Sequence, residues 1–398
     1  MGAEARIHPL SFCTEELQRL EAAGLSRRVR SLDSPSEPEV LLDGRRVLCF
    51  ASNNYLGLAA HPEVTAAASD AARRFGAGTG SARLITGGLT LHDELEAALA
   101  AFKGAEAALL FSSGYLANLG TISALVGRGD AVFSDALNHA SIIDGARLSR
   151  ADICVYGHGD AGHLEELLAR WRARASSGAR ALVVTDSVFS MDGDLAPLPE
   201  MADTCERHGA VLMVDEAHAS GVIGPGGRGA VAHFGLEGRV PVVMGTLSKA
   251  LGAAGGFIAG TGELCAFLRN RARSFIFDTA MPPPVAAAAR AALGVLQREP
   301  ERPERARALA RQLAAGLSAG GYRVAAPDAA IVPVVIGEAT DTMALSQGLL
   351  DRGVLVTAIR PPTVPPGTSR LRATVMATHT DAHLTRALEA FGNAAVRT

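Results

Sequence analysis

Short runs of apolar residues alternate with alanine-rich stretches along the middle of the chain. The runs read ALLFS, DAVFS, DICVYG, ALVVTDS, AVLMVDEAH, VPVVMGT and GGFIAG, and all lie between residues 57 and 291. Consecutive apolar positions are typical of strands that are buried on both faces of a mostly parallel sheet. The intervening stretches are long enough to form helices that cover such a sheet. The pattern predicts an α/β fold with one large domain over residues 57–291.

The two flanks of this region show other patterns. Residues 1–56 contain helical spacing with Thr14 as the expected N-cap, followed by the run EVLLDGRRVLCF. The Asp43-Gly44 pair in that run predicts a tight turn between two strands. Beyond a charged stretch that begins at Arg298, helical patterns alternate with the runs IVPVVIG, VLVTAIR and SRLRATV. We therefore predict an N-terminal helix and arm over residues 1–56 and a small C-terminal α/β domain over residues 292–398.

Composition and charge exclude several classes of function. The 398 residues carry a net charge of −3, with 38 basic and 41 acidic side chains interspersed. This balance offers no basic surface for nucleic acid or for an anionic membrane. The five cysteines form no C-x-x-C pair, which argues against a disulfide framework or a metal site and favours a reducing compartment. No apolar run is long enough to span a bilayer, and we expect a cytoplasmic protein.

Several of the apolar runs end in small or polar residues. Examples are FSSGY, FSDALNH, TDSVFSMDGD, VDEAH and GTLSK. In open α/β sheets, ligands bind beyond the carboxyl ends of the strands. The sequence thus places its reactive side chains where this architecture builds a site.

Lys249 and Asp215 form the first candidate pair. Lys249 follows an apolar run in GTLSKALGAAGG; a single lysine is more often a solvated loop residue, but these small neighbours leave room for a flat ligand. Asp215 ends AVLMVDEAH, where it could instead cap a helix or form a salt bridge. One strand–helix–strand excursion separates the two, so neighbouring strands can present both. An amine and a carboxylate at one ring are what pyridoxal phosphate (PLP) requires, the carboxylate facing the pyridine nitrogen.

Two histidines and one helix start extend this candidate site. His218 lies three residues after Asp215 and could bond the phenolic oxygen of the ring, and His139 in DALNHAS could stack on its open face. A lone histidine is more often structural, so neither is decisive alone. The phosphate needs backbone N–H groups at a helix N-terminus, which Ser113, Gly114 and Tyr115 offer in FSSGYLAN.

These motifs, in this order, resemble the α-oxoamine synthases. The segments that carry the resemblance include GAGTGSARLITGG, FSSGYLAN, DALNHAS, TDSVFSMDGD, VDEAHASGVIGPGGRG, GTLSKALG and FDTAMPPP, which together cover nearly the whole chain. Members of this family are fold-type I PLP transferases, related in fold to aspartate aminotransferase. They condense an amino acid with an acyl thioester and release CO2. The resemblance therefore implies a PLP-dependent acyltransferase.

The resemblance also implies roles for individual residues. It makes Lys249 the lysine that forms a Schiff base with the cofactor, Asp215 the partner of the pyridine nitrogen, and His139 the stacking histidine. The other implied cofactor contacts are His218 and Ser190 near the ring oxygen, Thr246 near the phosphate, and Thr279, which would reach the phosphate of the partner subunit's cofactor. We accordingly expect a homodimer.

The segment TAIRPPTVPPGTSRLR narrows the expected substrates. It is similar to the branch of the family that joins L-alanine to a pimeloyl thioester in biotin biosynthesis, with either CoA or acyl carrier protein as the carrier. Arg27, Asn53 and Arg360 match substrate-contacting positions. The first of these rests on counting back from Asn53, so Arg28 or Arg30 could take its place.

Three other functions remain open from the sequence. The chain could be another α-oxoamine synthase with a different amino acid or acyl chain. It could also catalyse an aminotransferase-like reaction, because fold alone does not determine reaction. A catalytically inactive partner subunit or a regulator is the third, and the intact set of Lys249, Asp215, His139 and His218 argues against it.

Overall fold

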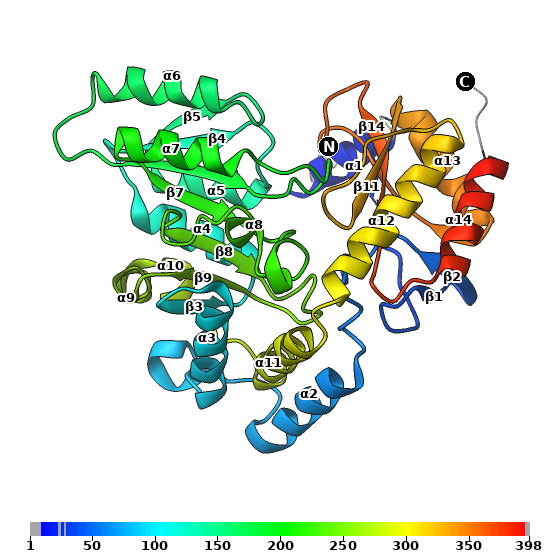
Figure 1. Ribbon diagram of the computed structural model, residues 1–398, viewed down its shortest axis with the longest axis horizontal. Coiled ribbons are helices and arrows are strands. Elements are labelled where there is room, and N and C mark those ends of the chain that lie inside the picture. The colour runs from blue at the N-terminus through cyan, green and yellow to red at the C-terminus, as the bar shows by residue number, and fades with distance from the viewer. Residues whose placement is uncertain (1–8, 23–24, 28, 395–398) are drawn as a thin grey trace, which may run out of the picture.

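The fold is built around a seven-stranded central sheet (Figure 1). The structure, a computed structural model, describes residues 9–22, 25–27 and 29–394. The strand order is β3-β9-β8-β7-β6-β4-β5, and only β9 runs antiparallel to its neighbours β3 and β8. The seven strands are the seven predicted runs, so the mostly parallel α/β sheet is confirmed: β3 (Ala107–Phe111), β4 (Ala131–Asp135), β5 (Asp152–Tyr156), β6 (Ala181–Asp186), β7 (Val211–Asp215), β8 (Val242–Thr246) and β9 (Gly256–Gly260).

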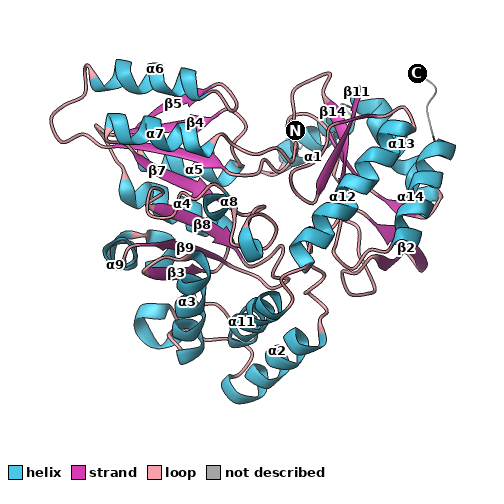
Figure 2. Cartoon of the chain, in the orientation of Figure 1, coloured by secondary structure: helices cyan, strands magenta, loops and turns pink. Residues whose placement is uncertain are grey.

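Helices cover both faces of this sheet (Figure 2). In every strand except the edge strand β5, successive residues such as Val132 and Phe133 belong to separate apolar cores, as the two-residue period of a strand requires. One core is completed by α3 (Thr90–Lys103), α6 (Ala161–Arg172), α7 (Leu198–His208) and α11 (Pro283–Arg298). The other is completed by α4 (Gly114–Leu125), α5 (Ala140–Ser149), α9 (Gly262–Arg271) and α10 (Arg273–Ile276). Apolar residues of these six strands are therefore buried on one face or the other. The edge strand β5 differs from the prediction, because Ile153 and Val155 are exposed on the face that no helix of the second core covers.

A second, antiparallel sheet lies in the C-terminal part of the chain. Its order is β10-β11-β14-β13, formed by β10 (Arg323–Val324), β11 (Ile331–Gly337), β13 (Thr357–Ile359) and β14 (Ser369–Thr374). Around it pack α12 (Arg302–Ala319), α13 (Ala339–Asp351) and α14 (Asp381–Ala394). These elements share one apolar core with Leu48 and Phe50 of the N-terminal arm. The arm is thus part of the C-terminal unit in space, although it is far away in sequence.

The predicted hairpin is confirmed. Strands β1 (Glu39–Leu42) and β2 (Arg45–Cys49) pair antiparallel, and β12 (Val354–Leu355) adds to β2 in parallel. Asp43 and Gly44 both have positive φ, at 50° and 73°. This is the backbone of the two-residue turn that an Asp-Gly pair favours.

Two expected boundaries differ from the structure. The helix α1 (Ser11–Ala22) already encloses Thr14, because Cys13 N–H donates to the Leu10 carbonyl and starts the helical turn earlier. The predicted boundary at 291/292 falls within α11, which continues to Arg298 and buries Leu293 and Leu296 in the central core. The three-part division of the chain itself stays a prediction.

The remaining elements complete the fold. They are α2 (Pro62–Phe75), the π-helical turn η1 (Arg83–Gly87), the 3-10 turn η2 (Pro225–Gly227) and α8 (Ala230–His233). Among the described residues, no helix has the length and apolar character needed to cross a membrane.

Candidate active site

Lys249 lies in the turn after β8, at the carboxyl edge of the central sheet. Backbone hydrogen bonds from Leu247 to Gly255 (3.0 Å) and from Gly252 to Lys249 (2.9 Å) shape this turn. Gly252 has a φ of +62° and lies so close to Ala59 that a Cβ would be 2.3 Å from its amide nitrogen. Nζ of Lys249 forms no hydrogen bond or ion pair with any described residue. Burial lowers the pKa of this amine to about 8, so it loses its proton readily.

Asp215 ends β7, the strand next to β8, and its carboxylate is buried. Oδ1 accepts a hydrogen bond from the Ala217 amide (2.8 Å), and Oδ2 accepts one from Nδ2 of Asn118 (2.7 Å). The neighbouring parallel strands thus deliver the predicted carboxylate and amine to the same edge of the sheet. Asp215 and Lys249 are close enough for the carboxylate to oppose the lowering of the lysine pKa.

A hydrogen-bonded relay joins Asp215 to His139. The second N–H of the Asn118 amide donates to Oγ of Ser141 (2.9 Å), and that Oγ lies 2.7 Å from Nδ1 of His139. The backbone N–H of Ser141 also donates to Nδ1 (3.2 Å). Because a backbone N–H can only donate, Nδ1 is an acceptor and the neutral ring carries its proton on Nε2. Sequence reasoning missed Asn118 and Ser141, since nothing in FSSGYLAN or NHAS marks them apart from ordinary helix residues.

A second buried carboxyl group, Asp186, lies beside Asp215. The two residues are register partners on β6 and β7. Oδ2 of Asp186 accepts the backbone N–H of His139 (2.7 Å), which orients the start of α5. Burial, with Asp215 adding to it, holds the pKa of Asp186 well above its usual range. Burial also lowers the pKa of His139.

The start of α4, residues Ser113–Gly114–Tyr115, can bind a phosphate through backbone N–H groups and is here called the phosphate cradle. Ser113 caps the helix by accepting the Leu116 amide (3.1 Å), which leaves the earlier N–H groups of this turn without partners in the helix. A Cβ on Gly114 would lie 2.5 Å from the Thr246 methyl carbon, and one on Gly256 would lie 2.6 Å from the Gly114 backbone. The helix start therefore sits directly against the ends of β8 and β9.

These features fit pyridoxal phosphate. To hold this cofactor, a site needs an unpaired amine for the aldehyde carbon, a buried carboxylate for the pyridine nitrogen, and free helix N–H groups for the phosphate. All three must lie close together. Lys249, Asp215 and the Ser113–Gly114–Tyr115 turn supply them at adjoining strand ends. One further polar atom is available, because the buried Oδ1 of Asn118 has no partner among the described residues.

His218, Asn53 and Ser190 are joined through two residues that sequence reasoning missed. Nδ1 of His218 lies 2.7 Å from the hydroxyl of Tyr55, which also contacts Oδ1 of Asn53 at 3.1 Å. The guanidinium of Arg372 donates to that oxygen (3.0 Å) and to the Tyr55 hydroxyl (3.2 Å), while its Nε donates to the Ser190 carbonyl. Burial, to which the charges of Lys249 and Arg372 add, holds the pKa of His218 well below its usual range. The signal for Arg372 was a charged residue inside the buried strand SRLRATV.

Arg27 and Arg360 line a groove that is separate from the residues around Lys249, here called the outer groove. A groove of about 1110 Å³ between the N-terminal arm and residues 343–363 is lined by both side chains and by Arg30. The hydrogen bond of the Arg360 side chain within the described residues runs to the Ser26 carbonyl at 3.1 Å. Arg28, the other alternative for Arg27, lies outside the described residues. Their roles as substrate contacts stay predictions.

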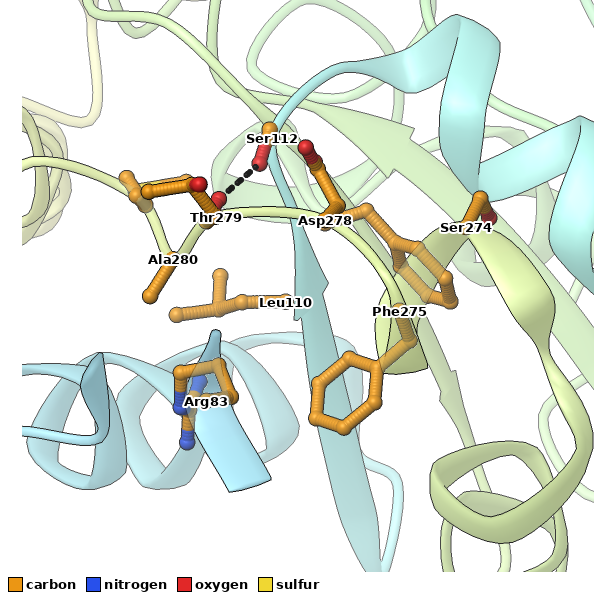
Figure 3. A pocket seen from close by; sticks show the side chains of 10 residues that line it. Arg83, Leu110, Ser112, Ser274, Phe275, Asp278, Thr279 and Ala280 are labelled. Atoms are coloured by element: carbon orange, nitrogen blue, oxygen red, sulfur yellow. Dashed lines mark hydrogen bonds between the residues drawn. The ribbon is translucent and has the colours of Figure 1, made fainter. Parts of the chain in front are cut away.

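Thr279 lies next to the start of α4 in the same chain. Figure 3 shows Oγ of Ser112 donating to its carbonyl (3.1 Å), beside a small pocket that Arg83 and Asp278 also line. Ser112 immediately precedes the phosphate cradle. The predicted contact of Thr279 with a partner subunit's cofactor stays a prediction.

A cleft of about 650 Å³, here called the acyl cleft, lies beside Ser190 and Asn138. One wall is formed by residues 189–192 and the other by the proline-rich loop over residues 361–368. Leu137, Ile143 and Met191 give it an apolar lining, and Asn138 connects it to His139 in the chain. The cleft can hold an aliphatic chain next to the cofactor site.

Comparisons with known proteins show the family of this chain. Residues 45–391 match the family model described as aminotransferase class I and II. An 8-amino-7-oxononanoate synthase from Anaeromyxobacter sp. (strain K) is 54% identical over 93% of this chain and 92% of that protein, and one from Geobacter sulfurreducens is 50% identical over 94% and 95%. A serine palmitoyltransferase structure solved with PLP superposes with a TM-score of 0.91 at 37% identity, covering 97% of this chain and 98% of the other.

Proposed function

Because this chain belongs to the 8-amino-7-oxononanoate synthases, within the class I and II aminotransferase family, we propose that it joins L-alanine to a pimeloyl thioester in biotin biosynthesis. The products are 8-amino-7-oxononanoate, CO2 and a free thiol. The observation that carries the proposal is that the unpaired Lys249 amine lies near the buried Asp215 carboxylate at the carboxyl edge of the sheet. The similarity to 8-amino-7-oxononanoate synthases supports this acyltransferase reaction over the other reactions of PLP enzymes.

The residues around Lys249 would hold and tune the cofactor. Pyridoxal phosphate, when bound, supplies an aldehyde carbon for an amine and a ring that accepts electrons. The Asp215 carboxylate would keep the pyridine nitrogen protonated, and the relay through Asn118 and Ser141 would keep the His139 ring in one orientation. The N–H groups at the start of α4 would bind the phosphate, with Thr246 beside them.

Lys249 would also move the proton at the amino acid. A lysine with a pKa about 8 is half neutral at pH 8, whereas an ordinary lysine is roughly 0.4% neutral at that pH. The amine can therefore accept the α-proton of alanine near neutral pH. Positioned proton transfer of this kind contributes roughly 10²–10⁴-fold to a rate.

Two arginines can bind the carboxylate of the amino acid. Arg372 is buried beside His218 and Lys249 and, after its three hydrogen bonds, keeps N–H donors to spare. Arg360 is more exposed and would have to leave Ser26 to reach the same place. We propose that the guanidinium of Arg372 is the main ligand of the alanine carboxylate and that Arg360 adds a second contact to it.

The acyl donor would occupy the cleft between residues 189–192 and the proline-rich loop. Its apolar lining suits the methylene chain of a pimeloyl group. Arg27 and Arg30 lie in the outer groove, where they could meet the acidic end of the donor or the phosphates of its carrier. We also propose a homodimer, in which Thr279 contacts the phosphate of the partner subunit's cofactor.

A substrate panel tests this function. We expect the purified enzyme with PLP to release CO2 and free thiol fastest with L-alanine and a pimeloyl thioester, supplied as the CoA or the acyl carrier protein ester. A hydrophobic pocket distinguishes one methylene by only about 1–3 kcal/mol, so slow turnover of glycine or serine is compatible with the proposal. A clear preference for glycine with acetyl-CoA, or for serine with a long-chain donor, would contradict it and leave the PLP assignment intact.

The two arginines should differ in their effect on alanine. Loss of a hydrogen bond to a charged group costs about 1.5–3 kcal/mol. We expect Arg372→Lys to lower kcat/KM for alanine about 100-fold, and Arg360→Ala to lower it about 10-fold through both KM and kcat. The matched control is Arg352→Ala, since that exposed side chain bonds only the Gly348 carbonyl within the described residues and should leave kinetics unchanged. Wild-type kinetics in Arg372→Lys together with a large loss in Arg360→Ala would make Arg360 the carboxylate fork instead.

A further inference from the structure

The loop over residues 187–196, here called the Ser190 loop, connects β6 to α7 and forms one wall of the acyl cleft. It is a short hairpin, with a bridge between Val188 and Leu195 and a hydrogen bond from the Gly193 amide to the Phe189 carbonyl (2.7 Å). Its base is tied to the cofactor site, because Oγ and the amide of Ser187 both donate to the Asp215 carbonyl at 2.8 Å. Its tip is held by side chains from other elements.

Cationic side chains hold the tip on two sides. From the C-terminal sheet, Arg370 pairs with Asp192, and Arg372 donates to the Ser190 carbonyl. From the opposite side, Nε2 of His158 contacts Oδ2 of Asp194 at 3.0 Å. The loop is thus clamped between the C-terminal unit and the end of β5.

His158 lies in the turn after β5 and is fixed to the end of β4. Its Nδ1 contacts Oδ1 of Asp135, the buried last residue of β4, at 3.0 Å. Its ring packs edge-on against Phe189 of the loop, with centroids 4.3 Å apart. Asp135 is further held by the amides of Leu137 and Gly159 (both 2.8 Å), so the anchor is rigid.

Both ring nitrogens of His158 face carboxylates, and only an imidazolium can donate to both. Hydrogen bonds to Asp135 and Asp194 raise the pKa of His158 to about 10. No other charged group contacts the ring among the described residues. Nearby, His163 accepts the Gly157 amide and Asp160 caps α6. His158 is therefore a permanent charged link between β4 and the loop at neutral pH.

We infer that His158 is a positioning residue that, through Asp194, holds the Ser190 loop in place as a wall of the acyl-donor cleft. This inference rests on the proposed function in one respect, which is that the acyl donor occupies that cleft. His158 does not line the cleft and acts only through the loop. Its loss should affect the acyl donor and spare the cofactor and the amino acid.

The test combines kinetics with hydrogen exchange. In His158→Asn, the loss of a charge-assisted contact should raise the KM for the pimeloyl thioester about 10-fold and leave the KM for alanine and PLP retention within about twofold. Amide exchange in residues 187–196 should speed up about 10-fold in the same variant. His163→Asn removes a neighbouring imidazole that does not contact the loop, and should change neither measurement.

A second variant, Asp194→Asn, tests the same link from the side of the loop. Asp194 is partly exposed, so this variant should fold even if His158→Asn does not, and it should reproduce the same two changes. The double variant should be no worse than either single variant, because both remove the same link. Unchanged donor KM with unchanged loop exchange in Asp194→Asn would overturn the inference, as would a fall in melting temperature alone. The exchange measurement needs no substrate, so it remains decisive even if the substrate panel contradicts the proposed function.

Discussion

Replacing Lys249 with alanine is expected to abolish turnover while the protein remains folded. The change removes both the amine that anchors the cofactor and the base that accepts the α-proton, so kcat should fall by at least about 10⁴-fold, the upper end of what positioned proton transfer alone contributes. Folding should survive, because Nζ of Lys249 bonds to no described residue and the turn is held by backbone hydrogen bonds. Steady-state CO2 release measures the loss.

Two companion variants isolate the role of the amine. Lys249→Arg keeps a positive charge but cannot bond covalently to the cofactor, so it should be as inactive as the alanine variant. Ser248→Ala changes the exposed neighbour and should retain full activity. Borohydride reduction of the wild type with PLP should attach the cofactor to the peptide that contains Lys249. Attachment to another lysine, or substantial turnover in Lys249→Ala without added amine, would refute the assignment.

Asp215→Asn is expected to weaken cofactor retention about 10- to 100-fold and to lower kcat by at least about 100-fold. A neutral amide cannot hold the pyridine nitrogen protonated, and a charge-assisted hydrogen bond is worth about 1.5–3 kcal/mol. The site can accept the new amide, because Asn118 can turn its unpaired Oδ1 toward it, although this turn gives up the hydrogen bond from Nδ2 to Ser141. The loss of kcat should therefore reflect the missing charge, with a smaller contribution from the hydrogen bond between Asn118 and Ser141, and not a disrupted fold.

The controls for this prediction use the same chemical change elsewhere. Asp160→Asn replaces the cap of α6, where asparagine caps as well as aspartate, and should leave activity and cofactor binding unchanged. Cofactor affinity is measured by equilibrium dialysis, and thermal unfolding of the two variants is compared. An Asp215→Asn enzyme with wild-type kcat would eliminate the proposed role of the carboxylate.

The local pattern of the chain was enough to predict the central sheet and the core of the site. Seven apolar runs became seven strands, and in six of them burial on both faces accounts for the apolar residues at successive positions, whereas the edge strand β5 leaves Ile153 and Val155 exposed. Asp215 and Lys249 could be paired because each follows a run, and the carboxyl ends of neighbouring parallel strands share one edge. Asp43-Gly44 encoded its turn through backbone preference alone. Each of these properties is local to a few residues.

Tertiary structure alone decided how distant segments meet. The antiparallel insertion of β9 between β3 and β8, and the union of the N-terminal arm with the C-terminal core, depend on chain crossings that periodicity does not record. Arg372 reaches Tyr55 and Asn53 across more than 300 residues, and His158 reaches Asp194 across 36. A sequence shows that an arginine lies in a buried strand. Which buried oxygen it bonds is decided only when register and packing bring the two together, since an uncompensated buried charge is too costly to leave unpaired.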